Sequence, residues 1–236
     1  MPSSSLTFEQ GKPIIMLPKL IDIHTHRSKT HGGLLQIANL DLKQPCPEEG
    51  LFSYGIHPWE TESPDFQEEN AIQLLKERLQ APNAVALGEA GLDKFHAGFE
   101  RQTKVLERQI ALSENLKKPM ILHVVKSHNE ILALRKKHKA RQPWILHGFN
   151  GTEQDIRQLT AYGLYLSAGE SLLHSERKIS KSLKNIPLDL LFLETDMAEV
   201  GIETIYDTAA NLLEMDTNVL RVQIFANFAR LFGIEK

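Results

Sequence analysis

Six side chains of metal-binding type lie at the C-terminal ends of short hydrophobic runs in this chain. They are His24, His26, Glu89, His123, His147 and Asp196. Short apolar runs bounded by turn residues are typical of buried parallel strands. A buried polar group without a partner is costly, so several such groups at strand ends favour a shared ligand. Because imidazoles and carboxylates bind divalent cations that activate water, the pattern predicts a metal-dependent hydrolase.

The strongest local signal is the pair His24 and His26, which follows the hydrophobic stretch 20–23. Alternate residues of a strand point to the same side, so both imidazoles can bind one ion. Asp22 lies on that same face. It is either an acceptor that orients a ligating imidazole or the ion itself, or an ordinary strand-end carboxylate that accepts hydrogen bonds.

Glu89 stands between Gly88 and the sequence Ala90-Gly91. The glycines let the backbone approach closely and leave the carboxylate free to bridge two ions. A glutamate in this position without the other five groups would be an ordinary loop residue. In their company, Glu89 is predicted to be a ligand and part of the catalytic apparatus.

His123, His147 and Asp196 each end an apolar run. A single buried histidine is more often a hydrogen-bonded core residue than a ligand, but two at matching strand ends favour ligation. Asp196 is expected to be the last ligand or the carboxylate that takes the proton of the attacking water. A carboxylate beside a cation keeps a low pKa and can still accept that proton.

Substrate contacts are expected from polar residues that follow the same strand ends. His57 precedes Pro58 at the end of a hydrophobic run, and we assign it to substrate binding rather than to metal binding. Lys94, His96, Lys126 and His128 are predicted to contact phosphate. The alternative for these four is an ordinary solvated loop charge.

The elements that position these residues alternate between strand and helix. Strands are predicted near 19–25, 34–39, 51–56, 84–88, 119–123, 144–147, 163–167 and 190–195. Helices are predicted over 67–79, 99–116, 129–138, 152–162, 202–213 and 217–232, with Thr217 as an N-cap. Such alternation predicts parallel strands with right-handed crossovers, here an irregular (β/α)8 TIM-type barrel. Strand C-termini of such barrels meet at one face, where active sites lie.

Segment 27–50 is too short for a full helical unit, so the barrel is expected to be shortened after its first strand. The 236 residues are 42% hydrophobic and contain no Pro/Gly/Ser-rich linker. We therefore expect one domain over 1–236, with 1–18 as a lead-in that covers the bottom of the barrel.

Composition narrows the setting. The single cysteine, Cys46, excludes an internal disulfide and a cysteine-based zinc cluster. A net charge of −3 provides no basic field for coating long nucleic acid, but it allows an enzyme that grips a few phosphates. Segment 1–10 lacks the features of an export signal, and no apolar stretch approaches a membrane span. We expect a cytoplasmic protein without a membrane partner, and favour a monomer.

The motifs together resemble those of TatD-type metal-dependent deoxyribonucleases, over nearly the whole chain from Ile21 to Gly233. The resemblance rests on Asp22-Ile23-His24-Thr25-His26, Gly55-Ile56-His57-Pro58, Gly88-Glu89-Ala90-Gly91-Leu92-Asp93, Leu122-His123, His147-Gly148-Phe149-Asn150-Gly151, Glu194-Thr195-Asp196 and the closing segment 227–233. It implies an irregular barrel of the amidohydrolase superfamily with one or two divalent metals. It also implies 3′–5′ exonuclease activity on single-stranded DNA or RNA.

The resemblance further implies roles for individual residues. His24 and His26 would bind one ion, and His123 and His147 the other. Glu89 would bridge the two ions, while Asp196 would bind the first ion and handle the attacking water. The six residues that would hold the metals are all present.

Three departures from the family pattern fall where substrate would lie. Segment 27–50 is short, and Val124-Val125-Lys126 replaces the family's Ser-Arg after the third histidine, which removes an arginine. Met197-Ala198-Glu199 replaces the family's Ala-Pro, and a downstream Arg-Asn-x-Pro is absent. The metal chemistry is therefore expected to be intact, while the substrate stays open among DNA, RNA, a modified aminoacyl-tRNA and small esters or amides.

Two other functions compete with a nuclease. A hydrolase of the same architecture could act on an amide, ester or lactone, and fold alone does not separate the two. A carboxylated lysine often bridges the metals of those relatives, and Glu89 in its place favours the nuclease. A non-catalytic barrel is disfavoured by the complete ligand set. Mixed His and carboxylate ligands suit zinc or manganese, whereas magnesium prefers more oxygen ligands, so Mg, Mn and Zn are all candidates.

Overall fold

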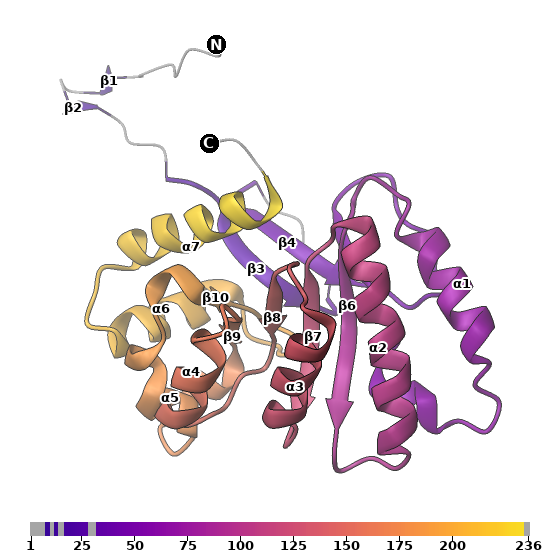
Figure 1. Cartoon of the computed structure of the whole chain (residues 1–236). Helices are drawn as coiled ribbons and strands as arrows, with labels where there is room; N and C mark the ends of the chain where they lie inside the picture. The colour runs from indigo at the N-terminus through magenta and orange to yellow at the C-terminus, as the bar shows by residue number, and fades with distance from the viewer. Residues whose placement is uncertain (1–7, 10–11, 14–16, 28–31, 234–236) are drawn as a thin grey trace.

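The barrel is built from eight parallel strands that are hydrogen-bonded in chain order (Figure 1). The structure is a computed structural model that describes residues 8–9, 12–13, 17–27 and 32–233. The strands are β3 (Leu20–Thr25), β4 (Leu34–Asn39), β5 (Leu51–Tyr54), β6 (Ala84–Asp93), β7 (Met120–Val125), β8 (Trp144–Leu146), β9 (Tyr165–Ala168) and β10 (Leu191–Leu193). All eight predicted strands and the TIM-type class are confirmed.

The six predicted helices are confirmed as well. They are α1 (Glu68–Arg78), α2 (Phe99–Leu116), α3 (His128–His138), α4 (Glu153–Thr160), α6 (Ile202–Leu212) and α7 (Thr217–Phe232). The structure adds elements that were not predicted, namely α5 (Lys178–Ser182) and the 3₁₀ turns η1 (Pro58–Glu62), η2 (Glu170–Leu173), η3 (Leu183–Asn185) and η4 (Leu188–Leu190). Elements of three to five residues are too short to show a hydrophobic period.

The prediction that Thr217 caps α7 is wrong by one residue. Asp216 is the N-cap, and its carboxylate accepts hydrogen bonds from the N–H groups of Asn218 and Val219. The Thr217 hydroxyl donates to Asp207 Oδ1 instead, at 3.1 Å. Aspartate and threonine are both good caps, so the sequence alone did not decide between neighbours.

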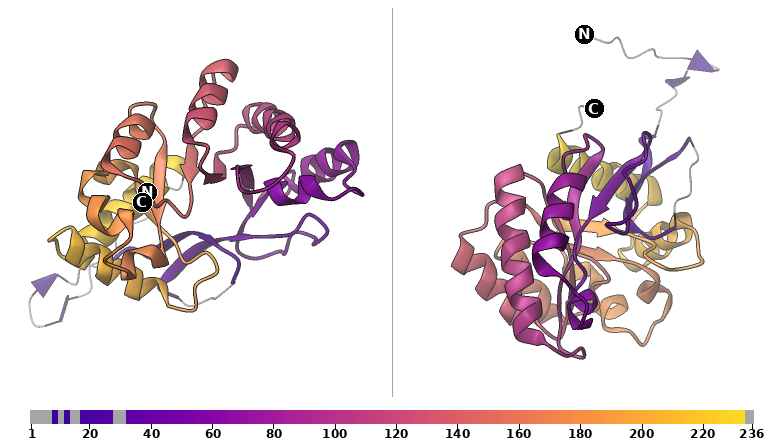
Figure 2. Two further views of the ribbon diagram at one scale, coloured as in Figure 1. Left: turned by 90° about the horizontal axis from the view of Figure 1, so that it is seen from below. Right: turned by 90° about the vertical axis from the view of Figure 1, so that its right-hand side faces the viewer.

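Helices cover the barrel unevenly. In the described part of the chain, no helix joins β3 to β4 or β4 to β5, which confirms the shortened first units. The strands finish at the lower side of Figure 1, so the left view of Figure 2 looks onto their C-terminal ends. In that view the helices surround the later strands and leave the β3–β4 side bare.

Two contacts compensate for the incomplete pairing of β3. Its outer edge is not paired with β10 at Ile21, and the Tyr206 hydroxyl of α6 satisfies both backbone groups of Ile21, at 3.1 Å each. At its end, Thr25 forms a parallel bridge with Asp196, where His26 N donates to Asp196 O and Asp196 N donates to His24 O. This bridge closes the barrel at its C-terminal mouth.

The opposite end of the barrel is covered by α7, which crosses it in Figure 1. Asn227 of α7 donates from its side chain to the carbonyls of Leu188 and Leu191 at the start of β10. The predicted lead-in is described only in part: β1 (Phe8–Glu9) and β2 (Lys12–Pro13) form a short antiparallel pair, and 14–16 lies outside the described residues. No helix within the described ranges is long and apolar enough to cross a membrane.

Candidate metal centre

The barrel brings the six predicted ligands to its C-terminal mouth. His24 lies in β3 and His26 directly after it, Glu89 lies in β6, and His123 lies in β7. His147 follows β8, and Asp196 follows β10. These six residues and His57 are called the His/carboxylate cluster below.

Glycine allows β6 and β7 to meet closely beside Glu89. Gly91 has φ +153°, and a Cβ atom there would lie 1.9 Å from the carbonyl oxygen of His123. A Cβ atom on Gly55 of the neighbouring chain segment would lie 2.4 Å from Glu89 O. The prediction that glycines near Glu89 allow a close backbone approach is therefore confirmed for Gly91 and for Gly88, whose Cβ atom would lie 2.6 Å from Ile121 O, and Gly55 adds a third case.

One carboxylate oxygen of Glu89 faces three imidazoles. Its Oε1 lies 2.9 Å from His123 Nδ1, 2.8 Å from His147 Nε2 and 3.1 Å from His57 Nε2. Three rings on one oxygen leave little room for water, and Glu89 itself is only 6% exposed. Glu89 Oε1 and the three ring nitrogens around it form the first of two groups of possible metal ligands.

The other oxygen of Glu89 faces the histidines of β3. Its Oε2 lies 3.4 Å from His24 Nε2 and 3.2 Å from His26 Nε2. The same two nitrogens lie 3.7 and 3.5 Å from Asp196 Oδ1. Glu89 therefore stands between two sets of donors, in the arrangement expected of a bridging carboxylate.

The cluster suits a divalent cation, because several buried ring nitrogens have no hydrogen-bond partner among the described residues and could serve as metal ligands. His24 is fully buried, and neither of its ring nitrogens has a hydrogen-bond partner among the described residues. His147 Nδ1 is also buried without a hydrogen-bond partner among these residues. Unpaired buried polar atoms are costly. Three sets of donor atoms lie within 4.8 Å of one another: His24, His26 and Asp196; His24, Glu89 and His147; His57, Glu89 and His123.

Charges in the cluster shift its titration strongly. Burial alone would raise the pKa of Glu89, but His147 and the hydrogen bonds from neighbouring rings outweigh it and hold this pKa well below its usual range. Burial opposes the charge on His147, and Glu89 nevertheless raises the His147 pKa well above the ordinary value. The two groups therefore stabilise each other as an ion pair when no cation is bound.

Asp196 differs from Glu89. Burial and the negative charges of Glu194 and Glu89 raise its pKa, although His147 and His24 act in the opposite direction. Its side chain is 39% exposed, so water can reach it. A carboxylate with a raised pKa that water can reach is suited to accept a proton.

Hydrogen bonds distinguish His57 from His123. Trp59 N–H donates to His57 Nδ1 at 3.2 Å, so the ring proton of neutral His57 lies on Nε2, the nitrogen that faces Glu89. His123 is reversed: its Nε2 faces Asp93 Oδ2 at 3.2 Å, which leaves the lone pair of Nδ1 toward Glu89. His57 is therefore arranged as a donor, and His123 is arranged as a ligand.

Supporting residues around the cluster were not assigned a role from the sequence. Glu194 is 1% exposed, accepts a hydrogen bond from Gly148 N–H, and has Oε1 3.7 Å from His147 Nδ1. Asp93 Oδ2 also accepts from Trp59 Nε1 at 2.9 Å. A glutamate that continues the apolar run before Asp196 was the one signal in the sequence, since buried acids are rare without a partner.

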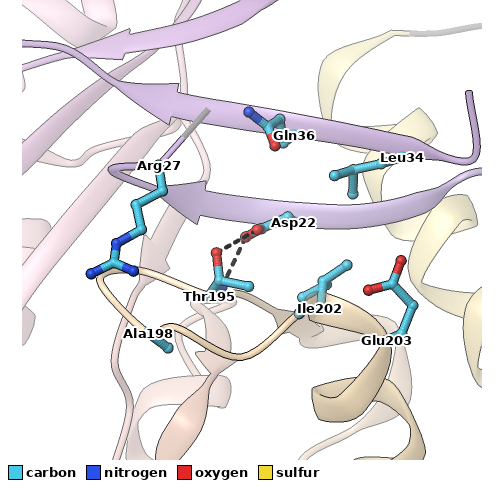
Figure 3. Close-up of a pocket in the computed structure, with 9 residues that line it drawn as sticks. Asp22, Arg27, Leu34, Gln36, Thr195, Ala198, Ile202 and Glu203 are labelled. Carbon is cyan, nitrogen blue, oxygen red and sulfur yellow. Dashed lines mark hydrogen bonds between the residues drawn. The ribbon is translucent and has the colours of Figure 1, made fainter. Parts of the chain in front are cut away.

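Asp22 behaves as a hydrogen-bonding carboxylate, the second of its two predicted alternatives. It accepts from Thr195 N at 3.0 Å and from Thr195 Oγ1 at 2.6 Å, as Figure 3 shows. Burial raises the pKa of Asp22 to about 7, against these hydrogen bonds. A small cavity of about 30 Å³ lies beside it, lined also by Arg27 and Ile202. Through these hydrogen bonds, Asp22 of β3 holds Thr195, the residue before Asp196, in place.

The predicted substrate contacts are placed differently from one another. Lys94 Nζ pairs with Glu130 at 2.5 Å, and His96 Nδ1 with Glu62 at 2.8 Å. Lys126 is exposed and lines a pocket that also reaches His147. Phosphate contacts by these residues remain predictions, and Lys126 is the one whose charge is not already paired within the described residues.

A parallel barrel with histidine and carboxylate donors at the C-terminal ends of its strands has the architecture of barrel-type metal-dependent hydrolases. Within that class, the chain belongs to the family of TatD-related DNases, whose sequence profile matches residues 26–233. This confirms the resemblance that the motifs indicated.

Individual relatives agree with the family. The chain is 28% identical over 234 residues to the 3′-5′ ssDNA/RNA exonuclease TatD of Klebsiella pneumoniae, covering 87% of this chain and 88% of the relative. It is 29% identical over 203 residues to an uncharacterized metal-dependent hydrolase of Buchnera aphidicola, covering 78% and 74%. It is 34% identical over 155 residues to the human 3′-5′ RNA nuclease TATDN2, covering 61% of this chain and 19% of that protein.

Solved structures confirm the fold. The crystal structure of YjjV, a TatD homolog from Escherichia coli, matches with a TM-score of 0.78 at 21% identity, covering 93% of this chain and all of that one. A TatD family hydrolase from Entamoeba histolytica matches with a TM-score of 0.74 at 16% identity, covering 92% and 99%.

Proposed function

We propose that the chain is a divalent-metal-dependent 3′–5′ exonuclease that hydrolyses phosphodiesters at the ends of single-stranded DNA or RNA. The observation that carries the proposal is Glu89, whose two oxygens face separate sets of histidines. The nuclease names of the Klebsiella and human relatives support the choice of a phosphodiester substrate.

We assign one ion to His24, His26 and Asp196, and a second to His123 and His147, with Glu89 between them. Divalent ions bound there would lower the pKa of water and stabilise negative charge on the phosphate. The mixed ligands suit zinc or manganese better than magnesium. His57 is assigned to the substrate. Because Trp59 N–H donates to its Nδ1, its Nε2 would carry the ring proton, which faces Glu89 Oε1 at 3.1 Å and could pass to a phosphate oxygen when a cation takes up the Glu89 charge.

We assign the proton transfer to Asp196. Its Oδ1 lies 3.5 Å from His26 Nε2 and its side chain is 39% exposed, so it can accept the proton of the attacking water at the edge of the metal site. Glu89 remains charged and holds the two sets of histidines in register. Asp22 and Glu194 keep Asp196 and His147 in place through the contacts described above. We take 1–236 as one domain and expect it to act in the cytoplasm as a monomer.

The test uses protein stripped of metal and single-stranded DNA labelled so that loss of the 3′ end is visible. Mg²⁺, Mn²⁺ and Zn²⁺ are added in turn, and Asp196→Asn protein is the control. We expect metal-dependent shortening from the 3′ end, with turnover in the variant lower by several powers of ten (on the order of 10³ or more). Near-normal turnover in the variant would remove Asp196 from its role.

DNA and RNA that stay intact with every ion, in protein that binds metal, would contradict the nuclease proposal. The amide, ester and lactone substrates of barrels with similar architecture would then be tested with the same metal-loaded protein.

A further inference from the structure

A pocket of about 550 Å³ opens directly beside the His/carboxylate cluster. His147 and Gly148 belong to its lining, so it is continuous with the proposed metal centre. The lining that bears on function comes from the loop after β6 (Phe95), the segment that follows β7 (Lys126 and His128), helix α4 (Asp155) and the start of α5 (Arg177 and Lys178).

The pocket is strongly basic. Lys126, Arg177 and Lys178 line it, and within the described residues none of them forms an ion pair. Its one carboxylate, Asp155, already accepts two hydrogen bonds from Thr152 at 2.7 Å and lies 3.5 Å from His128 Nδ1. Among the described residues, the pocket lining therefore contains three cations and no carboxylate that is free to pair with them.

Two of these cations lie near His128, which lines the same pocket. Burial lowers the pKa of His128, and the charges of Lys178 and Lys126 lower it further against the effect of Asp155. The two lysines come from different elements, one following β7 and the other starting α5. An anion bound in this pocket would reduce the repulsion between their like charges.

The backbone holds Lys126 in a conformation that lysine rarely adopts. Its φ is +55°, in the left-handed region, which is unfavourable for a residue with a Cβ atom. The turn is fixed on both sides: Lys94 N donates to Val125 O, and Ser127 Oγ donates to Leu92 O at 2.8 Å. The fold thus imposes this turn where the strand of His123 ends.

An exposed aromatic ring completes the pocket. Phe95 is 76% exposed and lines the same space as the cations. Cations combined with an exposed ring are the features that bind single-stranded nucleic acid, since phosphates need charge and bases stack on rings. A basic pocket for a small inorganic anion would have no use for that ring.

We propose that this pocket holds the nucleotide on the 5′ side of the scissile bond. Arg177, Lys178 and Lys126 bind the phosphate of that nucleotide, and Phe95 stacks on its base. The 3′-terminal nucleotide carries only the scissile phosphate, so a second phosphate must come from its 5′ neighbour. The proposal rests on the proposed nuclease function, and it names a phosphate site in a chain whose expected arginine is replaced by Val125.

The test compares two dinucleotides with metal-loaded enzyme. Thymidylyl-thymidine has one phosphate, and its 5′-phosphorylated form adds the phosphate that the pocket would bind. We expect the wild type to prefer the phosphorylated form in kcat/KM by about tenfold. Arg177→Gln and Lys178→Gln should each lose most of this preference. Lys181→Gln, an exposed lysine of α5 outside the pocket lining, should keep it.

A third substrate separates this proposal from the nuclease proposal. Bis(p-nitrophenyl) phosphate is a phosphodiester without a second phosphate, so its hydrolysis reports the metal centre alone. We expect Lys181→Gln to hydrolyse it as the wild type does, and continued hydrolysis by Arg177→Gln and Lys178→Gln to show that their metal centre is intact. Thymidylyl-thymidine phosphorylated on its 3′ hydroxyl is included as a further control. A preference for this control over the 5′-phosphorylated form, or equal preferences in Arg177→Gln and Lys181→Gln, would overturn the pocket assignment and leave the nuclease intact.

Binding is measured independently of turnover. Fluorescence anisotropy of labelled pentathymidylate with metal-free protein gives the dependence of affinity on salt. Each lost phosphate contact should reduce the slope of log K against log salt by about 0.7. Reduced slopes in Arg177→Gln and Lys178→Gln, in a protein that cleaves no phosphodiester, would support the pocket and contradict the nuclease. Unchanged slopes would overturn the pocket.

Discussion

The His/carboxylate cluster and the basic pocket share His147 as a common wall, yet they are built in opposite ways. In the cluster, four histidines and His57 surround one glutamate, and further acids such as Asp93 and Glu194 stand behind the rings. In the pocket, three cations form no ion pair with any of the described residues, and the aromatic ring of Phe95 is open to solvent.

The difference lies in which elements supply the residues. Cluster side chains come from strand ends, whose positions are fixed by the sheet, so each one is constrained by several others. The cations of the pocket and Phe95 come from loops and from the start of the short helix α5, which can change without disturbing the sheet. The barrel therefore determines the chemistry of the cluster, and its loops determine what the pocket receives.

Glu89→Gln tests the cluster most severely. The variant keeps the shape of the side chain but removes the charge shared by two sets of histidines, so turnover should fall on the order of a thousandfold. Bound metal, measured by elemental analysis, should fall with it. Glu170→Gln, at an exposed glutamate, is the control. Full activity with full metal content in Glu89→Gln would break the contrast between cluster and pocket.

Glu194→Gln tests the support behind the cluster. Glutamine can still accept from Gly148 N–H but no longer carries the charge near His147 Nδ1. Residues that support metal ligands in this way are worth about 10–100-fold in metal affinity or activity. Titration of metal-stripped variant with Zn²⁺ or Mn²⁺ measures the affinity. An unchanged affinity would show that the ring of His147 is positioned without Glu194.

Phe95→Ala tests the pocket. Loss of one stacking ring should weaken the binding of single-stranded oligonucleotides about tenfold. Continued hydrolysis of bis(p-nitrophenyl) phosphate should show that the metal centre of the variant is intact. Phe95→Tyr should bind like the wild type. Equal affinities for Phe95→Ala and the wild type would mean that the ring is only an exposed surface residue.

Asp155→Asn has the smallest expected effect and concerns the pocket wall. Burial raises the pKa of Asp155, but hydrogen bonds from Thr152 and the charge of His128 lower it overall. Its ionised form therefore adds stability above the unfolded pKa of about 3.9 and loses this effect as the pH falls through the folded pKa. The variant should unfold about 1 kcal/mol more easily at pH 7.

Urea unfolding measured at pH 7 and at a series of lower pH values tests this, because the difference should shrink as the pH falls through the folded pKa of Asp155. A difference that stays constant with pH would show that the hydrogen bonds of the Thr152 cap, rather than the charge, carry the effect.

The sequence indicates which residues lie at the strand ends of the cluster, because each one is marked by its immediate neighbours in the chain. An apolar run with a polar end marks His123 or His147 without any knowledge of neighbours, and barrel topology then places all strand ends together. The confirmed strands and helices follow from the same hydrophobic periods. Even Glu89 was recognisable from the glycines around it, which the close approach of β6 and β7 requires.

The remaining features depend on contacts between distant residues. Lys94 looked free in the sequence, but it pairs with Glu130, 36 positions away. Asp22 reaches Thr195 across the seam of the barrel, 173 positions away. Arg177 and Lys178 escaped notice because α5 has five residues and shows no period. A local sequence pattern does not predict such pairings, because the two residues come together only when the chain folds.

The bridge between Thr25 and Asp196 has one more consequence. In the described chain it joins the first and last strands of the barrel at their C-terminal ends, and residues on both of its sides supply donors to the same proposed ion. A cation held by His24, His26 and Asp196 would cross-link the first and last strands of the barrel. Resistance to unfolding should then rise with the logarithm of metal concentration, and chelation should loosen the barrel first where its two edges meet.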